Sequence, residues 1–248
     1  DSSMTRHELL IIMTVGMSTI AGSVMVVYTT MLFPIYGSGL IGHFLSASLI
    51  SVPAAIMYAN MMIPSNEKTD FPDEKSDDMY SSIMDAITQG TKNGLDIFLN
   101  VIAMLIVVMA LVFLVNSMLG LLPNLNGNPI TLELMLGYLF APLAWFMGIP
   151  WSESIIAGQL LGVKTALNEF VAYLYLSDTE NYQLSDKTRM ILLYALCGFA
   201  NFSSVGILLS GLSAMVPERR ADLISVSGKA LWCALLASCL TGFIIGIL

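Results

Sequence analysis

Charged residues are scarce in this chain. Only 11% of its 248 residues are Asp, Glu, Lys or Arg, whereas about a quarter of the residues in a typical soluble domain are charged. The mean hydropathy of +0.78 and the 17 methionines point the same way. This composition excludes an ordinary soluble domain and indicates an integral membrane protein. We expect a lipid bilayer around the chain and no nucleic-acid partner.

Histidine and cysteine are also few. His7 and His43 are far apart in the sequence, and Cys197, Cys233 and Cys239 lie in apolar stretches without the spacing of a metal site. A membrane enzyme would need a nucleophile or a metal cluster, and these residues give it little support. We therefore predict that the protein is not an enzyme, that it has no cofactor, and that its thiols are buried.

The chain lacks both an initiator Met and a signal peptide. It opens Asp-Ser-Ser and soon enters an apolar stretch, without the basic start and small-residue cleavage site of a secretion signal. We therefore expect it to be the C-terminal part of a longer protein.

Long apolar runs are abundant. A hydrocarbon core of roughly 30 Å needs about 20 apolar residues in a helix to cross it. The long apolar runs are 9–33, 40–63, 97–122, 190–215 and 221–248. We predict an all-α integral membrane fold with several spanning helices.

One polar stretch, 64–94, separates two of these runs. In its second half Ile83 and Ile87 recur at helical spacing opposite Asp78 and Asp85. This pattern predicts an amphipathic helix on the bilayer surface, and the alternative is a solvated loop with one helical turn. The basic residues that flank the first three membrane helices on this side are Arg6, Lys68, Lys75 and Lys92. By the positive-inside rule the stretch is cytoplasmic.

The remaining basic residues set the rest of the topology. Arg219 and Arg220 place the start of the last helix on the cytoplasmic side and the C-terminus outside, whereas Lys187 and Arg189 do not follow this scheme. We predict a multi-pass protein of the inner (plasma) membrane. Its regions are two membrane helices over 1–63, a cytoplasmic loop and surface helix over 64–94, a long membrane helix over 95–123, an interfacial helix and re-entrant hairpin over 130–178, and a broken helix followed by the final membrane helix over 186–248.

The stretch from 131 to 178 does not read as simple spans. Pro142, Gly148 and Pro150 break its apolar pattern, and it also carries charged residues. Irregular backbone at membrane depth is tolerated only where protein or a water-filled cavity surrounds it, and broken segments of this kind are typical of a transporter's binding site. We therefore predict a re-entrant hairpin in this stretch.

Three strongly polar residues, Lys164, Asn168 and Glu169, lie within GVKTALNEFVAY at 162–173. On a continuous helix their side chains would share one side. An ionisable group at membrane depth costs at least about 2.5–3.5 kcal/mol, and such groups usually face a pathway or a partner. The functional interpretation is a binding site. The structural one is an ion pair between Lys164 and Glu169 that holds two helices together.

A second polar group, Gly198-Phe-Ala-Asn-Phe-Ser-Ser-Val-Gly206, interrupts the run 190–215. Glycine, Asn and Ser are the residues that a locally unwound helix needs, although small residues also let helices pack closely. Asn201 between Phe199 and Phe202 suits a flat ligand that forms hydrogen bonds. We therefore predict a broken transmembrane helix here.

A third polar group, MSTIAGSV at 17–24, lies in the first run. The hydroxyls of Ser18, Thr19 and Ser23, together with carbonyls loosened near glycine, suit a hard cation such as sodium. The alternative is that these small residues only pack helices together.

At these three sites the sequence resembles the concentrative nucleoside transporters. GVKTALNEFVAY at 162–173 matches the family signature, which is Gly or Ala, any residue, Lys, three residues, then Asn-Glu-Phe-Val-Ala and an aromatic residue or Met. YALCGFANFSSVGI at 194–207 and STIAGSVM at 18–25 support the resemblance, which extends to the C-terminus.

The resemblance implies a cation-coupled nucleoside symporter that takes up nucleosides such as uridine by alternating access. A sodium gradient, or protons in some bacterial members, would drive it. The resemblance also implies a homotrimer, with 97–122 as the trimer scaffold, and a substrate held between two re-entrant hairpins and two broken helices. The first hairpin, with its Gly-Gln-(Thr or Ser)-Glu motif, would lie before residue 1.

The resemblance also implies roles for single residues at the nucleoside site. Glu169 would accept hydrogen bonds from the ribose hydroxyls, and Asn201 and Ser204 would complete the ribose contacts. Phe199 would line the same pocket, and Val24 would face the nucleobase.

The sodium site would be formed by the side chain of Thr19, the carbonyl of Ile20, and Ser23. Lys164 and Asn168 are expected as supporting polar residues. Two alternatives remain open: a proton-coupled nucleoside symporter in which the signature carboxylate titrates, and a structural membrane subunit that transports nothing.

Overall fold

The chain is helical throughout the part that the computed structural model describes, residues 4–65, 81–124 and 129–248. Its helices there are α1 (Arg6–Ser18), α2 (Gly22–Tyr36), α3 (Leu40–Met62), α4 (Ile83–Leu119), α5 (Leu132–Phe146), α6 (Trp151–Ala166), α7 (Glu169–Ser177), α8 (Asp186–Ala195), α9 (Phe202–Met215), the 3₁₀ turn η1 (Pro217–Arg219) and α10 (Arg220–Ile247). No strand occurs in these residues, so the prediction of an all-α fold is confirmed.

Short polar side chains define where many of these helices begin. A helix leaves its first backbone N–H groups without partners, and an Asn, Ser or Thr at the N-cap accepts a hydrogen bond from one of them. In six helices the N-cap side chain accepts from the N–H three residues later: Thr5, Ser82, Thr131, Asn168, Ser185 and Asn201. The chain therefore encodes the breaks between its helices locally.

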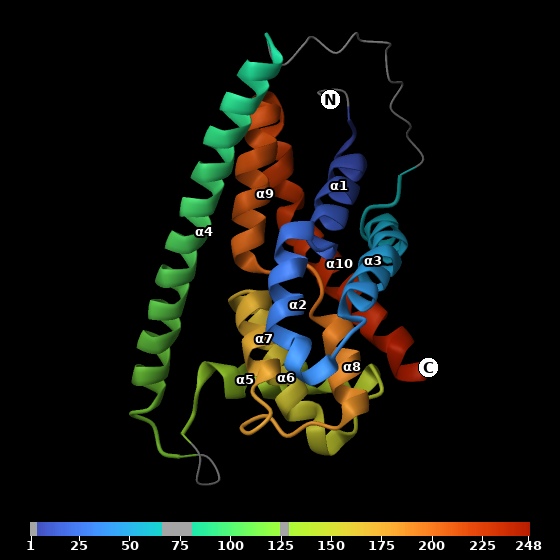
Figure 1. The fold of residues 1–248 in the computed structure, drawn as a ribbon, viewed down its shortest axis with the longest axis vertical. Helices are drawn as coiled ribbons and strands as arrows, with labels where there is room; N and C mark the ends of the chain where they lie inside the picture. Colours follow the sequence, from blue (N-terminus) through green and yellow to red (C-terminus); the bar gives the residue numbers. More distant parts are fainter. Residues whose placement is uncertain (1–3, 66–80, 125–128) are drawn as a thin grey trace.

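The helices α1, α3 and α10 pack against one another, and α8 also packs against α10. In Figure 1, α4 runs along one side of the molecule, and α5 and α6 lie at the end away from the N-terminus. The pair α5 and α6 is bent by 118° at the break between its two helices, which pack closely against each other. A Cβ at Gly158 would collide with the carbonyl oxygen of Gly137, so glycine allows the two backbones to touch here.

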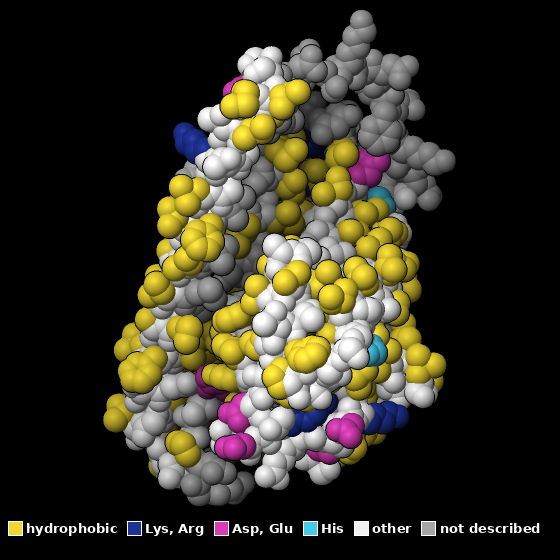
Figure 2. Space-filling view, viewed as in Figure 1, with side chains coloured by type: hydrophobic (Ala, Val, Ile, Leu, Met, Phe, Trp, Pro, Cys, Tyr) yellow, Lys and Arg dark blue, Asp and Glu magenta, His cyan; other side chains and the backbone are white. Residues whose placement is uncertain are grey.

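Three stretches of the described residues are long and apolar enough to cross a membrane: 6–36, 40–62 and 217–247. The bent pair of α5 and α6 adds a fourth if it counts as one span, and within α4 the segment 109–119 forms a shorter apolar helix. Figure 2 shows hydrophobic side chains over most of the visible face, with charged side chains gathered toward its two ends. This distribution suits a protein surrounded by lipid at its middle.

The structure differs from the sequence-based expectations at three places. The first apolar run is two helices, α1 and α2, separated at residues 19–21. The break in the fifth run covers residues 196–201, because Ser203 to Gly206 already belong to α9. The helix α4 is continuous across residue 94, where the sequence suggested the end of a surface helix. Most of the polar loop, residues 66–80 with Lys68, Lys75 and Asp78, lies outside the described residues.

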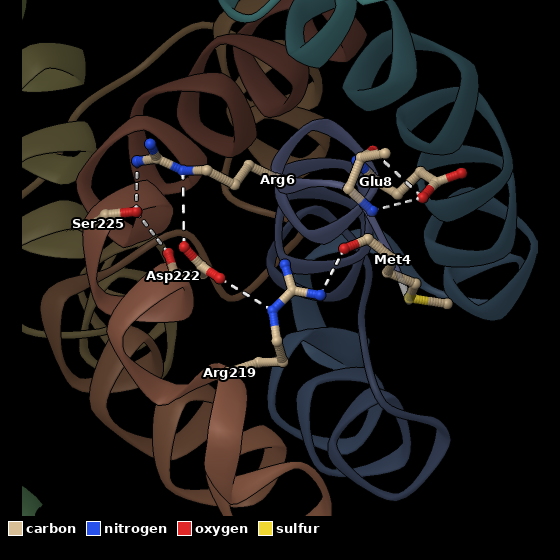
Figure 3. Close-up of polar contacts among 7 residues, drawn as sticks. Met4, Arg6, Glu8, Arg219, Asp222 and Ser225 are labelled. Atoms are coloured by element: carbon tan, nitrogen blue, oxygen red, sulfur yellow. Dashed lines mark hydrogen bonds and ion pairs between the residues drawn. The ribbon is translucent and has the colours of Figure 1, made fainter. Parts of the chain in front are cut away.

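Charged residues tie the starts of α1 and α10 together at one end of the molecule, as Figure 3 shows. The Arg219 Nε lies 2.8 Å from Asp222 Oδ2, and its Nη1 donates to the carbonyl of Met4. Arg6 donates to Ser225 Oγ at 2.6 Å and lies 3.9 Å from Asp222. Arg6 and Arg219 are therefore on the same side, as the positive-inside reading requires.

Candidate functional site

The connection between α6 and α7 is where the polar signature lies. Leu167 ends α6 and Asn168 adopts an extended conformation, with φ −169° and ψ 168°. The Asn168 Oδ1 accepts a hydrogen bond from the N–H of Val171 at 3.0 Å, so it starts α7. Glu169 is then the first residue of α7, and its side chain is 4% exposed. The signature thus creates a helix break and places a buried carboxylate directly after it.

The connection between α8 and α9 has the same design. Asn201 is the N-cap of α9, and its Oδ1 accepts hydrogen bonds from the N–H of Ser204 at 2.8 Å and from its hydroxyl at 2.9 Å. These bonds orient the amide so that its Nδ2 donates to Glu169 Oε2 at 2.9 Å. Asn201 is 1% exposed. Two helix starts, 32 residues apart in sequence, therefore meet through one side-chain hydrogen bond.

The other oxygen of the Glu169 carboxylate also has a donor. The Tyr28 hydroxyl, from α2, donates to Glu169 Oε1 at 2.9 Å. We did not single out Tyr28 in the sequence. A signal exists, because Tyr28 follows Val24 by four residues and so lies on the same side of a helix. Both carboxylate oxygens are thus held by neutral donors, Tyr28 on one and Asn201 on the other.

These groups line one cavity of about 380 Å³. All five residues predicted to contact the nucleoside are among its lining: Val24, Glu169, Phe199, Asn201 and Ser204. Asn168 and Tyr28 also line it, and Phe98 and Ile102 contribute apolar surface from α4. Its walls are otherwise mostly apolar, with aromatic side chains and a few convergent polar groups, which is the usual character of a small-molecule site.

Lys164 does not take part in this cavity. Its Nζ donates to the carbonyl oxygen of Ala195 at 2.8 Å, and the side chain is 0% exposed. Among the described residues, the ion pairs within 4.0 Å do not include Lys164 with Glu169. The structural alternative, in which these two side chains pair, is therefore wrong. Lys164 holds the end of α8 instead.

The residues predicted for sodium lie at the break between α1 and α2. Thr19 is the C-cap of α1, and its hydroxyl donates to the carbonyl of Val15 at 3.2 Å. The N–H of Ile20 donates to Ser48 Oγ at 3.4 Å, and Ser23 is exposed in the first turn of α2. The last carbonyls of α1 bring the negative end of its dipole to this break, and the first N–H groups of α2 bring the positive end of another.

The break before α9 passes directly against the end of α1. Gly198 has φ 124°, and a Cβ there would lie 2.6 Å from the carbonyl oxygen of Ser18. Two interrupted helices therefore cross at their interruptions, close to the buried carboxylate. No group of three or more His, Cys, Asp or Glu that could hold a metal occurs in the described part of the chain. A cation at this crossing would depend on hydroxyl and carbonyl oxygens.

The fold and the site together define a class of protein. Broken helices that place a buried carboxylate, amide and hydroxyl inside an apolar helical body are the arrangement of secondary membrane transporters. Comparison with known proteins then identifies the family. A family model described as "Na+ dependent nucleoside transporter C-terminus" matches residues 43–246.

Individual proteins agree with this match. The uncharacterized transporter YutK of Bacillus subtilis is 39% identical over 251 residues, covering 99% of this chain and 60% of the relative. The nucleoside permease NupC of Helicobacter pylori is 36% identical over 250 residues, covering 99% of this chain and 58% of the relative. The structure of CNTnw in an inward-facing substrate-bound state is 36% identical and has a TM-score of 0.84, covering 99% of this chain and 58% of that one.

The chain belongs to the family of sodium-dependent, concentrative nucleoside transporters. The resemblance seen in the sequence is thereby confirmed, as is the prediction of a transporter in place of an enzyme. The chain spans about 60% of the length of the bacterial relatives given above.

Proposed function

We propose that this chain forms the substrate-binding part of a sodium-coupled nucleoside symporter that works by alternating access. The observation that carries the proposal is the buried Glu169 carboxylate, which lines the cavity and receives one neutral donor on each oxygen. A carboxylate oxygen has room for a further hydrogen bond. The adjacent 2′- and 3′-hydroxyls of a ribose match this demand, because each has a proton to donate.

If the ribose lies against Glu169, the other residues of the cavity have the following roles. Asn201 and Ser204 provide polar atoms beside the carboxylate, where the ribose hydroxyls would lie. Val24 and Phe199 provide apolar surface for the flat nucleobase. Asn168 acts indirectly, since its amide starts α7 and so places Glu169.

Sodium is the coupling ion that this site favours. Thr19, Ile20 and Ser23 offer hydroxyl and carbonyl oxygens at the break between α1 and α2, and a hard cation prefers such ligands. Binding of sodium would order this break and raise nucleoside affinity, and the nucleoside would raise sodium affinity by the same factor. The family description, which specifies sodium, supports this choice.

One observation favours a second candidate, proton coupling. Glu169 is buried, and its side-chain partners, Tyr28 and Asn201, are neutral. Without a cationic partner in contact, such a carboxyl group is suited to take up a proton during the cycle. Uptake that continues without sodium and becomes faster as the external pH falls would select this mechanism over sodium coupling.

The whole transporter is part of the proposal. We propose that the full-length polypeptide that contains these residues supplies a first hairpin at the N-terminal side, lies in the inner membrane and assembles as a homotrimer. The helices α6 and α7 would form the second re-entrant hairpin, and the 97–122 part of α4 would belong to the trimer scaffold. The breaks at residues 167–168 and 196–201 support the hairpin and the broken helix, respectively.

The test uses this full-length polypeptide in proteoliposomes. Uptake of radiolabelled uridine is measured with and without an inward sodium gradient for the wild type, for Glu169→Gln and for the control Glu180→Gln, which changes an exposed carboxylate. We expect sodium-dependent uptake that collapses in Glu169→Gln and persists in the control. Absence of uridine uptake by the wild type under both sodium and proton gradients would contradict the proposal.

A further inference from the structure

We infer that Tyr28 is a positioning residue of the nucleoside site, whose hydroxyl sets the Glu169 carboxylate in the orientation that binds ribose. The inference rests on the proposed function and adds to it a residue outside all three sequence motifs that indicated the site. The Tyr28 Oη donates to Glu169 Oε1 at 2.9 Å, on the oxygen that Asn201 leaves free.

The Tyr28 side chain is held in one position, so its hydroxyl points to Glu169. The side chain is 1% exposed, and its ring lies between aromatic neighbours. The ring centroids of Tyr173, Phe44 and Phe170 are at 4.7, 6.3 and 6.3 Å. A buried phenol needs a hydrogen-bond partner, and packing of this kind holds its ring in one position. The hydroxyl is therefore a fixed donor, against which the carboxylate is aligned.

Two hydrogen bonds fix the orientation of the Glu169 carboxylate, whereas one alone would not. Glu169 has a long side chain whose terminal torsion is soft, so a single hydrogen bond from Asn201 leaves the carboxylate plane free to rotate. The second bond, from Tyr28, fixes this plane. Both donors and the carboxylate line the same cavity. The oxygen positions that remain for a ligand are thereby oriented before the ligand arrives, which reduces the ordering that binding must supply.

The position of Tyr28 on α2 also links the two parts of the site. Helix α2 begins at Gly22, directly after the break that carries the proposed sodium ligands. Tyr28 lies six residues further on, or about 9 Å along a rigid helix. A movement of α2 at the break therefore reaches Glu169 through one hydrogen bond.

A merely structural tyrosine and a positioning tyrosine make different predictions. If Tyr28 orients Glu169 toward the ribose, Tyr28→Phe weakens binding of a nucleoside that has the 2′- and 3′-hydroxyls and leaves binding of one that lacks them nearly unchanged. If Tyr28 only stabilises the fold, both ligands are affected alike. Phe keeps the ring and removes only the hydroxyl, so the substitution is nearly isosteric.

The experiment compares uridine with 2′,3′-dideoxyuridine in proteoliposomes that contain the full-length polypeptide. The KM of uridine and the inhibition constant of dideoxyuridine against tracer uridine uptake are measured under a saturating sodium gradient. We expect Tyr28→Phe to raise the KM of uridine by up to roughly tenfold, because ligand binding must then supply the ordering of the carboxylate that Tyr28 supplies in the wild type. The inhibition constant of dideoxyuridine should change less than about twofold, which is the size of change expected when a substitution does not interact with the part of the ligand that is bound.

Tyr173→Phe is the matched control. It also removes one buried tyrosine hydroxyl from the same aromatic cluster, but that hydroxyl donates to the carbonyl of Leu193 and not to Glu169. We expect it to change the two constants by equal factors. A uridine-induced shift in the thermal unfolding of the purified variants gives a second readout that needs no transport.

Three results decide whether Tyr28 positions the Glu169 carboxylate for ribose. A larger loss for uridine than for dideoxyuridine in Tyr28→Phe, but not in Tyr173→Phe, supports the inference. Equal losses for the two ligands, or no loss for either, overturn it while the wild type still transports uridine. Failure of the wild type to take up or bind uridine is a separate result, because it overturns the proposed function itself.

Discussion

The ammonium group of Lys164 lies 2.8 Å from the carbonyl oxygen of Ala195, the last residue of α8. Two other side chains hold the same helix end: the Tyr173 hydroxyl donates to the carbonyl of Leu193, and the Thr241 hydroxyl donates to the carbonyl of Tyr194. A helix leaves its last carbonyls without partners. Side chains from α6, α7 and α10 supply the donors here, so the end of α8 is fixed from three directions just before its chain breaks.

Lys164→Met should therefore destabilise the protein. Met fills a similar volume but offers no donor, so the Ala195 carbonyl stays buried without this partner, which costs about 1–3 kcal/mol. The loss of the positive charge at the negative end of the α8 dipole acts in the same direction. We expect a lower melting temperature for the purified protein in detergent, measured by thermal unfolding.

The control is Lys92→Met, which removes a lysine from an exposed position on α4. It should leave the melting temperature within experimental error of the wild type. An unchanged or higher melting temperature in Lys164→Met would mean that relief of the buried charge outweighs the lost hydrogen bond.

Arg189 has a comparable role at the other end of the same helix. Its guanidinium donates to the carbonyls of Leu176 at 2.9 Å, Tyr182 at 2.7 Å and Leu184 at 3.2 Å. Arg189→Lys keeps the charge but cannot reach three carbonyls at once, because an ammonium lacks the planar fork of donors. We expect faster hydrogen exchange in residues 177–185, measured by mass spectrometry.

Lys187→Gln is the matched change for this segment, since Lys187 is exposed two residues away. Its exchange rates over 177–185 should equal those of the wild type. Equal rates in Arg189→Lys would show that the guanidinium is not what orders the connection.

Gly198→Ala should disrupt the crossing of the two broken helices. The new methyl group would meet the carbonyl oxygen of Ser18 at 2.6 Å, and the φ of 124° is strained for any residue with a Cβ. Such strain costs of the order of 1–3 kcal/mol. We expect a lower melting temperature and reduced uridine uptake in proteoliposomes.

Gly206→Ala tests whether replacing any glycine in this region by alanine would lower the melting temperature. A Cβ at Gly206 meets nothing within 4 Å, and alanine favours the helix by up to about 1 kcal/mol. Its melting temperature should match or exceed that of the wild type. If the two variants behaved alike, the close approach at Gly198 would not be limiting.

Asn201→Asp separates the two tasks of this side chain. A carboxylate can still accept the hydrogen bond from the N–H of Ser204 and start α9, but it cannot donate to Glu169. Two carboxylates would then face each other, and like charges at this distance repel strongly. We expect a helix start that is retained by circular dichroism and uridine uptake that is largely lost. Retained uptake would contradict the part that we assign to the amide.

Much of the site could be predicted from the sequence because its parts are local. Asn168 and Asn201 start helices by accepting a hydrogen bond from the N–H three residues ahead, which is a local pattern. On the sequence alone Asn168 was nevertheless considered on a continuous helix, whereas the structure breaks the chain at residues 167–168. The break before α9 ends at residue 201, earlier than its polar residues suggested, since Ser203 and Ser204 take part in the first helical turn. The sequence did not predict that α4 is one continuous helix. Its first turns are polar and the rest is apolar, so the two parts were assigned to different elements although the helix runs through both.

The sequence by itself determined the membrane class, the helix starts and the family signature, since hydropathy and capping depend on residues a few positions apart. Only the tertiary structure decided which groups meet. Tyr28 and Glu169 are 141 positions apart, and Lys164 and Ala195 are 31 apart. The partner of Lys164 is a backbone carbonyl, which every residue possesses, so no pattern of side chains marks it. Such contacts arise only when the helices pack, because burial obliges each polar group to find the nearest available partner.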